Sequence, residues 1–168
     1  QHEFSRILAE GLDRETLLEA ILNSALRLPE LDGGGLYWRK PDGSYRLVAQ
    51  RGLSPAFFAK ADHLAADSPQ AEIIRQGRLR CSCTPAQNHC TDPSLVLEPV
   101  LVEESVRSLM VLPIHVGGEP VACLNLASKQ VRAVGRLTIT AMETLARQFT
   151  QALERLLAQE QIVNQRQN

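Results

Sequence analysis

Residues 108–128, SLMVLPIHV-GGE-PVACLNLAS, give the clearest indication of the architecture of this chain. Each of its two apolar runs has the length of a β-strand, and the glycine pair between them can adopt the positive φ that a tight hairpin turn needs. Residues 134–163, which follow, repeat apolar side chains with helical spacing. We therefore expect an antiparallel hairpin that leads into a long helix.

Signals of the same kind precede this hairpin. Two amphipathic helical patterns, separated at Gly11, run through residues 1–28; Asp13 caps the second and Pro29 ends it. A turn over 41–44 joins a strand over 36–39 to a strand over 45–51. Between the hairpins the sequence indicates the following elements in order: helices over 55–60 and 69–76, a strand over 78–83, an irregular segment, and a helical turn or loop over 95–102.

This order of elements predicts an α+β fold in a single domain over residues 1–168. A central antiparallel sheet would carry the terminal helices, about residues 1–28 and 134–163, on one face. The irregular middle segment would form a roof over the other face. We also expect the terminal helices to link this domain to flanking domains outside the given sequence.

Composition excludes some classes of partner. The chain has 18 basic and 19 acidic side chains and only 4% aromatic residues, which argues against a nucleic-acid-binding surface. No apolar run approaches the length of a membrane span, and the first residues lack the pattern of a signal peptide. We therefore expect no membrane insertion and a cytoplasmic location, where the four cysteines would be reduced.

The order of elements, together with the leucine–proline strand, the glycine turn and Leu124-Asn125-Leu126, resembles the GAF domain, a small-molecule-sensing module of signalling proteins. The resemblance implies a non-catalytic sensory or regulatory module of a multidomain signal-transduction protein, for example in a two-component system. In such a module a small ligand or an oxidant acts under the roof, and the terminal helices pass the change to an output domain. The alternative interpretation is a ligand-free GAF domain that serves as a dimerisation spacer.

The densest group of reactive side chains is Cys81, Cys83, His89 and Cys90, in the expected roof. Thiolate and imidazole groups bind zinc, and thiolates hold iron–sulfur clusters, but the paired C-x-x-C spacing of structural zinc sites is absent. We name these four as candidate ligand-binding or redox residues. A metal or iron–sulfur cluster stays open, beside the simpler interpretation that no cofactor binds and the thiols pack as small apolar groups. Cys123, on a central strand, would join them only if its side chain faces the roof.

Other chemistries of GAF domains fit the sequence poorly. Bilin-binding members resemble one another in a cysteine followed by a histidine, whereas this chain has His89-Cys90. Haem ligation by His63, His89 or His115 has no supporting motif, and the cyclic-nucleotide signature is not reproduced at 125–129. The chain also resembles the free methionine-sulfoxide reductases in its roof cysteines, which would make Cys83 and Cys90 the attacking and resolving thiols. The sequence around both cysteines differs from that family, so we expect no enzymatic activity.

The C-terminal helix carries a stripe of apolar residues at the a/d spacing of a coiled coil. Its members, taken as a candidate homodimer interface, are Met142, Leu145, Phe149, Ala152, Leu156 and Val163. The same face could instead pack on the sheet. Both can hold at once, because a helix over 134–163 is about 45 Å long at 1.5 Å per residue, whereas typical strands are about 20 Å long.

Overall fold

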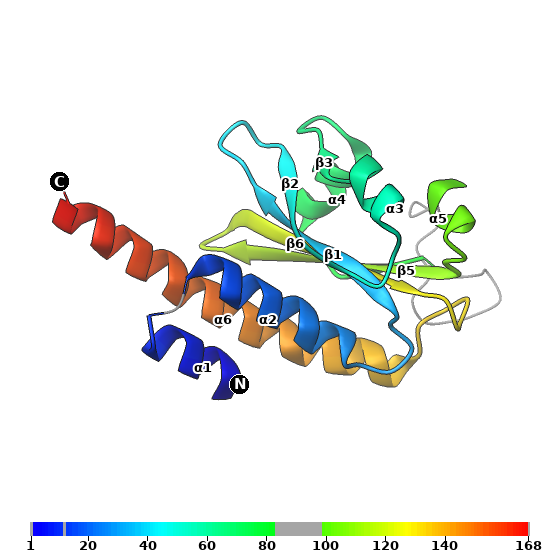
Figure 1. Ribbon diagram of the computed structural model, residues 1–168, viewed down its shortest axis with the longest axis horizontal. Helices are drawn as coiled ribbons and strands as arrows, with labels where there is room; N and C mark the ends of the chain where they lie inside the picture. The colour runs from blue at the N-terminus through cyan, green and yellow to red at the C-terminus, as the bar shows by residue number, and fades with distance from the viewer. Residues whose placement is uncertain (1, 12, 83–98, 168) are drawn as a thin grey trace.

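The computed structural model describes residues 2–11, 13–82 and 99–167 (Figure 1). The helices in these ranges are α1 (His2–Ala9), α2 (Arg14–Leu26), α3 (Pro55–Lys60), α4 (Pro69–Gln76), α5 (Pro99–Glu103) and α6 (Arg136–Gln167). The strands are β1 (Gly33–Arg39), β2 (Tyr45–Arg51), β3 (His63–Leu64), β4 (Arg80–Cys81), β5 (Ser108–Val116) and β6 (Glu119–Ser128).

The strands form one sheet in the order β3-β2-β1-β6-β5-β4, and every neighbouring pair is antiparallel. The expected hairpin is β5–β6, and its tip carries Gly117 and Gly118 with φ of 61° and 79°. The first hairpin is β1–β2, but β1 begins at Gly33, three residues earlier than the sequence indicated. The two hairpins meet through β1 and β6, which are the central strands.

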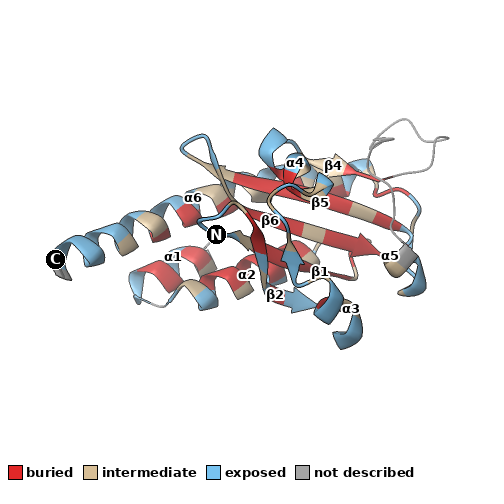
Figure 2. Cartoon of the chain, turned by 90° about the horizontal axis from the view of Figure 1, so that it is seen from above, coloured by how far each residue is buried: buried red, intermediate tan, exposed pale blue. Residues whose placement is uncertain are grey.

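One face of the sheet is covered by α2 and α6, and α1 packs against these two helices, as Figure 1 shows. The main core lies here, because alternate residues of β1, β5 and β6 point towards these helices and are almost fully buried; they include Leu36, Met110, Leu112, Leu124 and Leu126. Phe4 of α1 meets Phe149 of α6 edge to face, with ring centroids 5.7 Å apart. The C-terminal part of α6 extends beyond the sheet as an exposed rod (Figure 2).

The opposite face carries α3, α4 and α5 (Figure 1). The helix expected over 69–76 is confirmed as α4: Ser68 Oγ accepts the Ala71 N–H at its start, and Gly77 ends it with φ 72°. Of the expected strand over 78–83, residues 80–81 pair with β5, and residues 83–98 lie outside the described part of the chain. The predicted α+β arrangement, with terminal helices on one face and a roof on the other, is confirmed.

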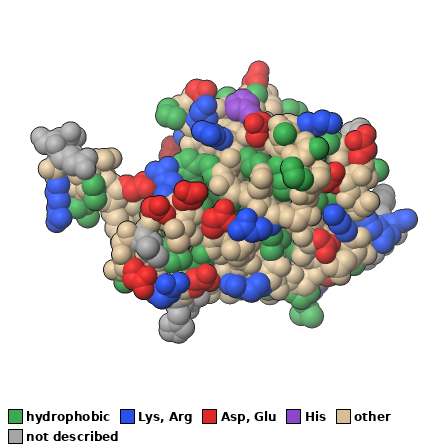
Figure 3. All heavy atoms as spheres, viewed as in Figure 1, with side chains coloured by type: hydrophobic (Ala, Val, Ile, Leu, Met, Phe, Trp, Pro, Cys, Tyr) green, Lys and Arg blue, Asp and Glu red, His purple; other side chains and the backbone are tan. Residues whose placement is uncertain are grey.

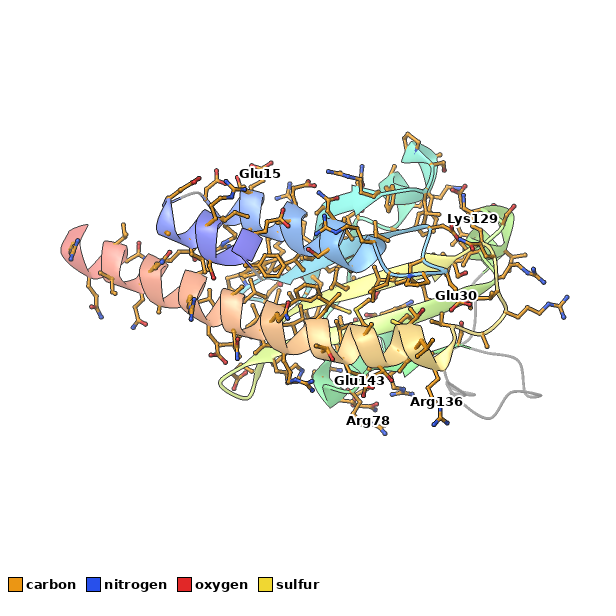
Figure 4. All side chains as sticks on the ribbon, turned by 90° about the horizontal axis from the view of Figure 1, so that it is seen from below. Glu15, Glu30, Arg78, Lys129, Arg136 and Glu143 are labelled. Carbon is orange, nitrogen blue, oxygen red and sulfur yellow. The ribbon has the colours of Figure 1, made fainter. Side chains whose placement is uncertain are left out.

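The loop between α2 and β1 fastens the start of α6 to the sheet. Figure 4 labels Glu30 at the end of the molecule where α6 begins. Its carboxylate accepts hydrogen bonds from the Gly135 N–H at 2.9 Å and the Thr138 hydroxyl at 3.3 Å. Asp32, two residues on, accepts from the Lys129 N–H and the Gln130 side-chain amide, so both ends of the β6–α6 connection are held.

The surface has no large region of one charge on the face drawn in Figure 3, where acidic and basic side chains alternate. This agrees with the balanced composition of the chain. Within the described ranges, no helix has an apolar stretch long enough to cross a membrane.

Candidate functional site

A cavity of about 570 Å³ lies between the sheet and the helices α3, α4 and α5, which together form the described part of the roof. Its floor is formed by the central strands, with Gly34, Gly35 and Tyr37 from β1 and Asn125 and Ala127 from β6. Apolar side chains from the roof and from β5 form most of its walls; they include Phe57, Phe58, Ile73, Leu101, Leu109 and Val111. This volume falls within the range of about 300–1,000 Å³ that small-molecule sites occupy.

Glycine shapes the floor of this cavity. Gly35 faces the roof, and a Cβ there would lie 2.5 Å from Leu47 Cδ1 and 3.8 Å from Phe58 Cε1. At Gly34 a Cβ would lie 2.2 Å from the Asn125 carbonyl oxygen on β6. The two glycines therefore let β1 lie close to its neighbours, and the Leu47 side chain covers Gly35 on the roof side.

Two contacts hold α3 in place over the floor. The Tyr37 hydroxyl donates to the Ala61 carbonyl at 2.6 Å, which fixes the C-terminal end of α3 to β1. At the other end, the Ser54 N–H and hydroxyl donate to the Glu104 carboxylate at 2.8 and 2.9 Å. Ser54 is also the N-cap of α3, since its Oγ accepts the Phe57 N–H. The roof is thus tied to the sheet by β1 and to the end of α5 by Glu104.

The pKa of Glu104 is lowered from its ordinary value, and the largest cause is the hydrogen bond from the Ser54 backbone, followed by that from its hydroxyl. Both bonds favour the ionised carboxylate. The contact between α3 and α5 is therefore made by a charged acceptor at neutral pH.

The side chain of Asn125 is the polar group at the middle of the floor. It lies on the central strand β6, opposite Gly35 of β1 and Val111 of β5. The Cys123 thiol donates to its Oδ1 at 3.3 Å. Burial raises the pKa of Cys123 far above its ordinary value, so this thiol keeps its proton and is unsuited to nucleophilic chemistry.

The described cysteines lie on opposite faces of the sheet. Cys81 pairs with Met110, and both side chains belong to the core beneath the terminal helices. Cys123 packs instead with Tyr37 and Ile74 on the roof side. The sequence left open that Cys81 and Cys123 would meet as metal ligands or redox partners, and this is wrong because the sheet separates them.

The remaining candidates of the cysteine cluster, Cys83, His89 and Cys90, lie outside the described residues. Their proposed role therefore stays a prediction. Within the described part of the chain, no group of three His, Cys, Asp or Glu side chains is placed to hold a metal ion. Cys81 itself does not line the cavity, so its role as a ligand-binding residue gains no support from this site.

The histidines named for haem occupy different surroundings. His63 is exposed and lies on the rim of the cavity. His115, on β5, donates from Nε2 to the Ile74 carbonyl at 2.7 Å, which joins the hairpin to the end of α4. His115 therefore has a structural partner of its own.

The apolar stripe of α6 is largely covered by the protein itself. Met142, Phe149, Ala152 and Leu156 are buried in the main core, and Leu145 packs against that core. Val163, the last member, is 51% exposed, and its neighbour Ile162 is 49% exposed. Among the described members of this stripe, it is therefore the end of α6 that is open to a partner helix. Dimerisation stays a prediction.

Sequence reasoning missed the residues that form the cavity. The strand expected over 36–39 leaves out Gly34 and Gly35, and Asn125 enters the sequence argument only as part of Leu124-Asn125-Leu126. The signal that pointed to them is a run of three glycines beside strand-forming residues, which often marks a close approach of two backbones. Phe57 and Ile73 carry no such signal, because their position depends on how the roof helices pack.

Comparison with known proteins adds a family and a set of similar structures. The family model described as GAF domain matches residues 11–154. No curated protein sequence matches this chain significantly. A domain of a putative two-component sensor histidine kinase from Sinorhizobium meliloti 1021 is 20% identical, with a TM-score of 0.68, over 92% of this chain and 98% of its own.

Two further structures show the range of proteins with this fold. The phycoerythrobilin-bound GAF domain from a cyanobacterial phytochrome is 20% identical with a TM-score of 0.72, covering 95% of each chain. A type II free methionine-R-sulfoxide reductase from Thermoplasma acidophilum is 16% identical with a TM-score of 0.61, covering 84% of this chain and 93% of its own. At such low identity the likeness shows a shared fold alone.

Proposed function

This chain belongs to the GAF domain family, and we propose that it is a non-catalytic sensory module that binds a small molecule between the sheet and the roof. The observation that carries the proposal is the cavity of about 570 Å³, whose mostly apolar lining surrounds the side chain of Asn125 on the central strand β6. Mostly apolar walls with a few polar groups are typical of small-molecule sites. The similar structures include a sensor kinase domain and a bilin-bound domain, which supports a sensory role.

The strand β1 offers a physical route from the cavity to the C-terminal helix. Gly35 and Tyr37 lie on the cavity side of this strand, and Trp38 packs on the helix side. The Arg14 guanidinium lies over the Trp38 ring, 4.6 Å from its centroid, and also bonds Glu160 of α6. A ligand that shifts β1 would therefore change how Trp38 and Arg14 contact α6. Coupling between the cavity and α6 requires contacts that differ in this way between the free and the bound state.

The wider setting of this module is part of the same proposal. A flanking output domain, such as that of a two-component system, would receive the change through α6, and a cytoplasmic homodimer would use the exposed end of that helix. The length of α6 supports this part of the proposal. The helix has 32 residues, about 48 Å at 1.5 Å per residue, and its last turns are exposed. No covalent bilin is included in the proposal, because His89-Cys90 has the reverse of the usual order.

A thermal-shift screen tests the proposal. Wild-type protein and Ile73→Trp, which places a large ring in the cavity from α4, are screened against one panel of metabolites, nucleotides and bilins. We expect at least one compound to raise the Tm of the wild type but not that of Ile73→Trp, and to alter hydrogen exchange in α6. If no compound does so, the module is a ligand-free spacer.

An activity assay separates the enzymatic alternative from this proposal. The protein is incubated with free methionine sulfoxide and a thiol reductant. We expect no turnover. Turnover that is lost in Cys83→Ser or Cys90→Ser would replace the sensory proposal by a reductase.

A further inference from the structure

The N-terminal helix α1 is held against the rest of the chain by a small surface. Its apolar side chains, Phe4 among them, are buried where α1 packs against α2 and α6, and Phe4 meets Phe149 of α6 edge to face. The preceding residue, Glu3, forms an ion pair on the surface with Arg27 at the end of α2, at 3.3 Å. We call the surface around Phe149 and Arg27 the α1 seat. Because an isolated helix of eight residues is unstable in water, α1 depends on this seat for its structure.

The direction of α1 is set by the turn that joins it to α2. Figure 1 shows α1 running back beside α2 in the opposite direction. Gly11 in this turn has φ 70°, which residues other than glycine rarely adopt, and a Cβ added there would meet no atom within 4 Å. Glycine at this position therefore serves the conformation of the backbone and not the packing of a neighbour.

Asp13 is the second residue that separates α1 from α2. Its Oδ1 accepts hydrogen bonds from the Thr16 N–H at 3.0 Å and from the Thr16 hydroxyl at 2.8 Å, so it caps the start of α2. A cap stabilises a helix end and therefore opposes continuation of α2 towards α1. Gly11 and Asp13 thus act together to break the helix between them.

Apart from this break, the sequences of α1 and α2 have the pattern of one continuous helix. The residues that follow one another at alternating spacings of four and three are Phe4, Leu8, Gly11, Glu15, Leu18, Leu22 and Ala25. The apolar members are buried in the structure, and the two exceptions, Gly11 and Glu15, lie at the break. A straight helix over 2–26 would therefore present the apolar residues of both parts on one face and carry α1 away from its own seat.

We propose that α1 is an exchangeable segment: the α1 seat of one copy also accepts α1 of a second copy, and the turn at Gly11 and Asp13 decides between a closed monomer and an exchanged dimer. A second copy supplies the same Phe4 and Glu3, so the exchanged contacts are those made within one chain. The free-energy difference between the two states therefore lies mainly in the two turns and in the cost of association. This inference goes beyond the proposed function, since it needs neither a ligand in the cavity nor the exposed end of α6.

Variants of the turn test this exchange in a background that lacks the other proposed dimer contact. Every protein carries Ile162→Lys and Val163→Lys, which place charges on the exposed end of α6. We expect Gly11→Ala/Asp13→Ala to lower the dissociation constant of the dimer about a hundredfold or more, measured by analytical ultracentrifugation, because alanine disfavours the left-handed turn about tenfold in each of two chains. Gly11→Asn is the matched control. Asparagine tolerates this conformation, so the constant should stay close to that of the background.

Cross-linking identifies the segments that meet in the dimer. One preparation of the Gly11→Ala/Asp13→Ala protein also carries Glu3→Cys, and a second carries Arg27→Cys; the two positions face each other in the ion pair. After mixing and re-equilibration, a short bismaleimide should join the two chains covalently, because α1 of one copy lies on the seat of the other. Each preparation alone is the control for the native cysteines and should give far less of this product.

Dimerisation of Gly11→Ala/Asp13→Ala that is no stronger than in the background would overturn the exchange, and so would a dimer without the cross-link between positions 3 and 27. Equal dimerisation of Gly11→Asn and the alanine variant would also overturn it, since the left-handed turn would then not decide between the two states. The proposed function fails by a different result, namely a panel in which no compound stabilises the wild type over Ile73→Trp.

Discussion

Arg14 of α2 and Glu160 of α6, 146 positions apart in sequence, form a two-contact ion pair with distances of 3.1 Å and 2.5 Å. The same guanidinium lies over the ring of Trp38, the single tryptophan of the chain. One side chain thus connects the part of α6 that extends beyond the sheet to the strand that floors the cavity. Both charged partners are partly exposed, at 42% and 33%, so the contact can open without a large cost.

Arg14→Ala should therefore loosen the end of α6 without unfolding the protein. We expect a loss of about 1 kcal/mol or less in the free energy of unfolding, because exposed ion pairs and cation–π contacts are each weak. Hydrogen exchange should become faster in residues 157–167, and the fluorescence of Trp38 should change. The matched control is Arg6→Ala. It breaks the exposed ion pair between Arg6 of α1 and Glu10, the residue that follows this helix. If hydrogen exchange in α6 is the same in Arg14→Ala as in the wild type, Arg14 does not connect α6 to Trp38 of β1.

The neighbouring glycines of β1 should differ in their response to alanine. At Gly34 the new Cβ would lie 2.2 Å from the backbone oxygen of Asn125, which cannot move without breaking the sheet. At Gly35 the close atom is the end of the Leu47 side chain, which can rotate away. We expect Gly34→Ala to lower the free energy of unfolding by about 3 kcal/mol and Gly35→Ala by about 1 kcal/mol, measured by urea denaturation. The reverse order would show that the floor is not shaped as described.

The Ser54–Glu104 contact should make the roof sensitive to acid. The pKa of Glu104 is lower in the folded protein than its ordinary value of 4.5. Its contribution is therefore present above that ordinary value and is lost as the pH falls through the lowered folded-state pKa. Glu104→Gln should flatten the acid limb of a plot of stability against pH, measured by urea denaturation from neutral pH downwards.

The matched control for this prediction is Glu103→Gln, which removes an exposed carboxylate at the last residue of α5, next to Glu104. It should leave the acid limb as in the wild type. Ser54→Ala, in contrast, should cost about 1 kcal/mol at neutral pH because α3 also loses its N-cap. If Glu103→Gln and Glu104→Gln behave alike, the hydrogen bonds from Ser54 do not determine the response.

Local chemistry made much of the fold predictable from sequence. The cap Asp13, the turn glycines and the two apolar runs of strand length in β5 and β6 each act within a few residues, and all are found as expected. The face of α6 was predictable only as apolar. The periodicity of α6 does not show whether the sheet, α1 or a second chain covers this face. In the structure Phe4 of α1 covers part of it by packing against Phe149.

The candidate site was far less predictable, for a physical reason. The cavity depends on the pairing of Gly35 with Asn125, which are distant in sequence and meet only through the register of two central strands. Reactive residue types drew attention to the cysteines instead. Of those, Cys81 faces the terminal helices, which strand alternation alone could not assign without knowing which face they cover.

Glu30 provides a final prediction, because its backbone is in the left-handed region with φ 74° while its carboxylate binds the start of α6. Glu30→Ala loses the bonds to Gly135 and Thr138 and keeps the unfavourable backbone, so we expect a loss of about 1–2 kcal/mol, as for a helix cap. Glu30→Gly loses the same bonds but relieves the backbone, and should be about 1 kcal/mol more stable than Glu30→Ala. Urea denaturation of the two variants measures the difference. A glycine variant that is less stable than the alanine variant would show that the carboxylate is held without strain.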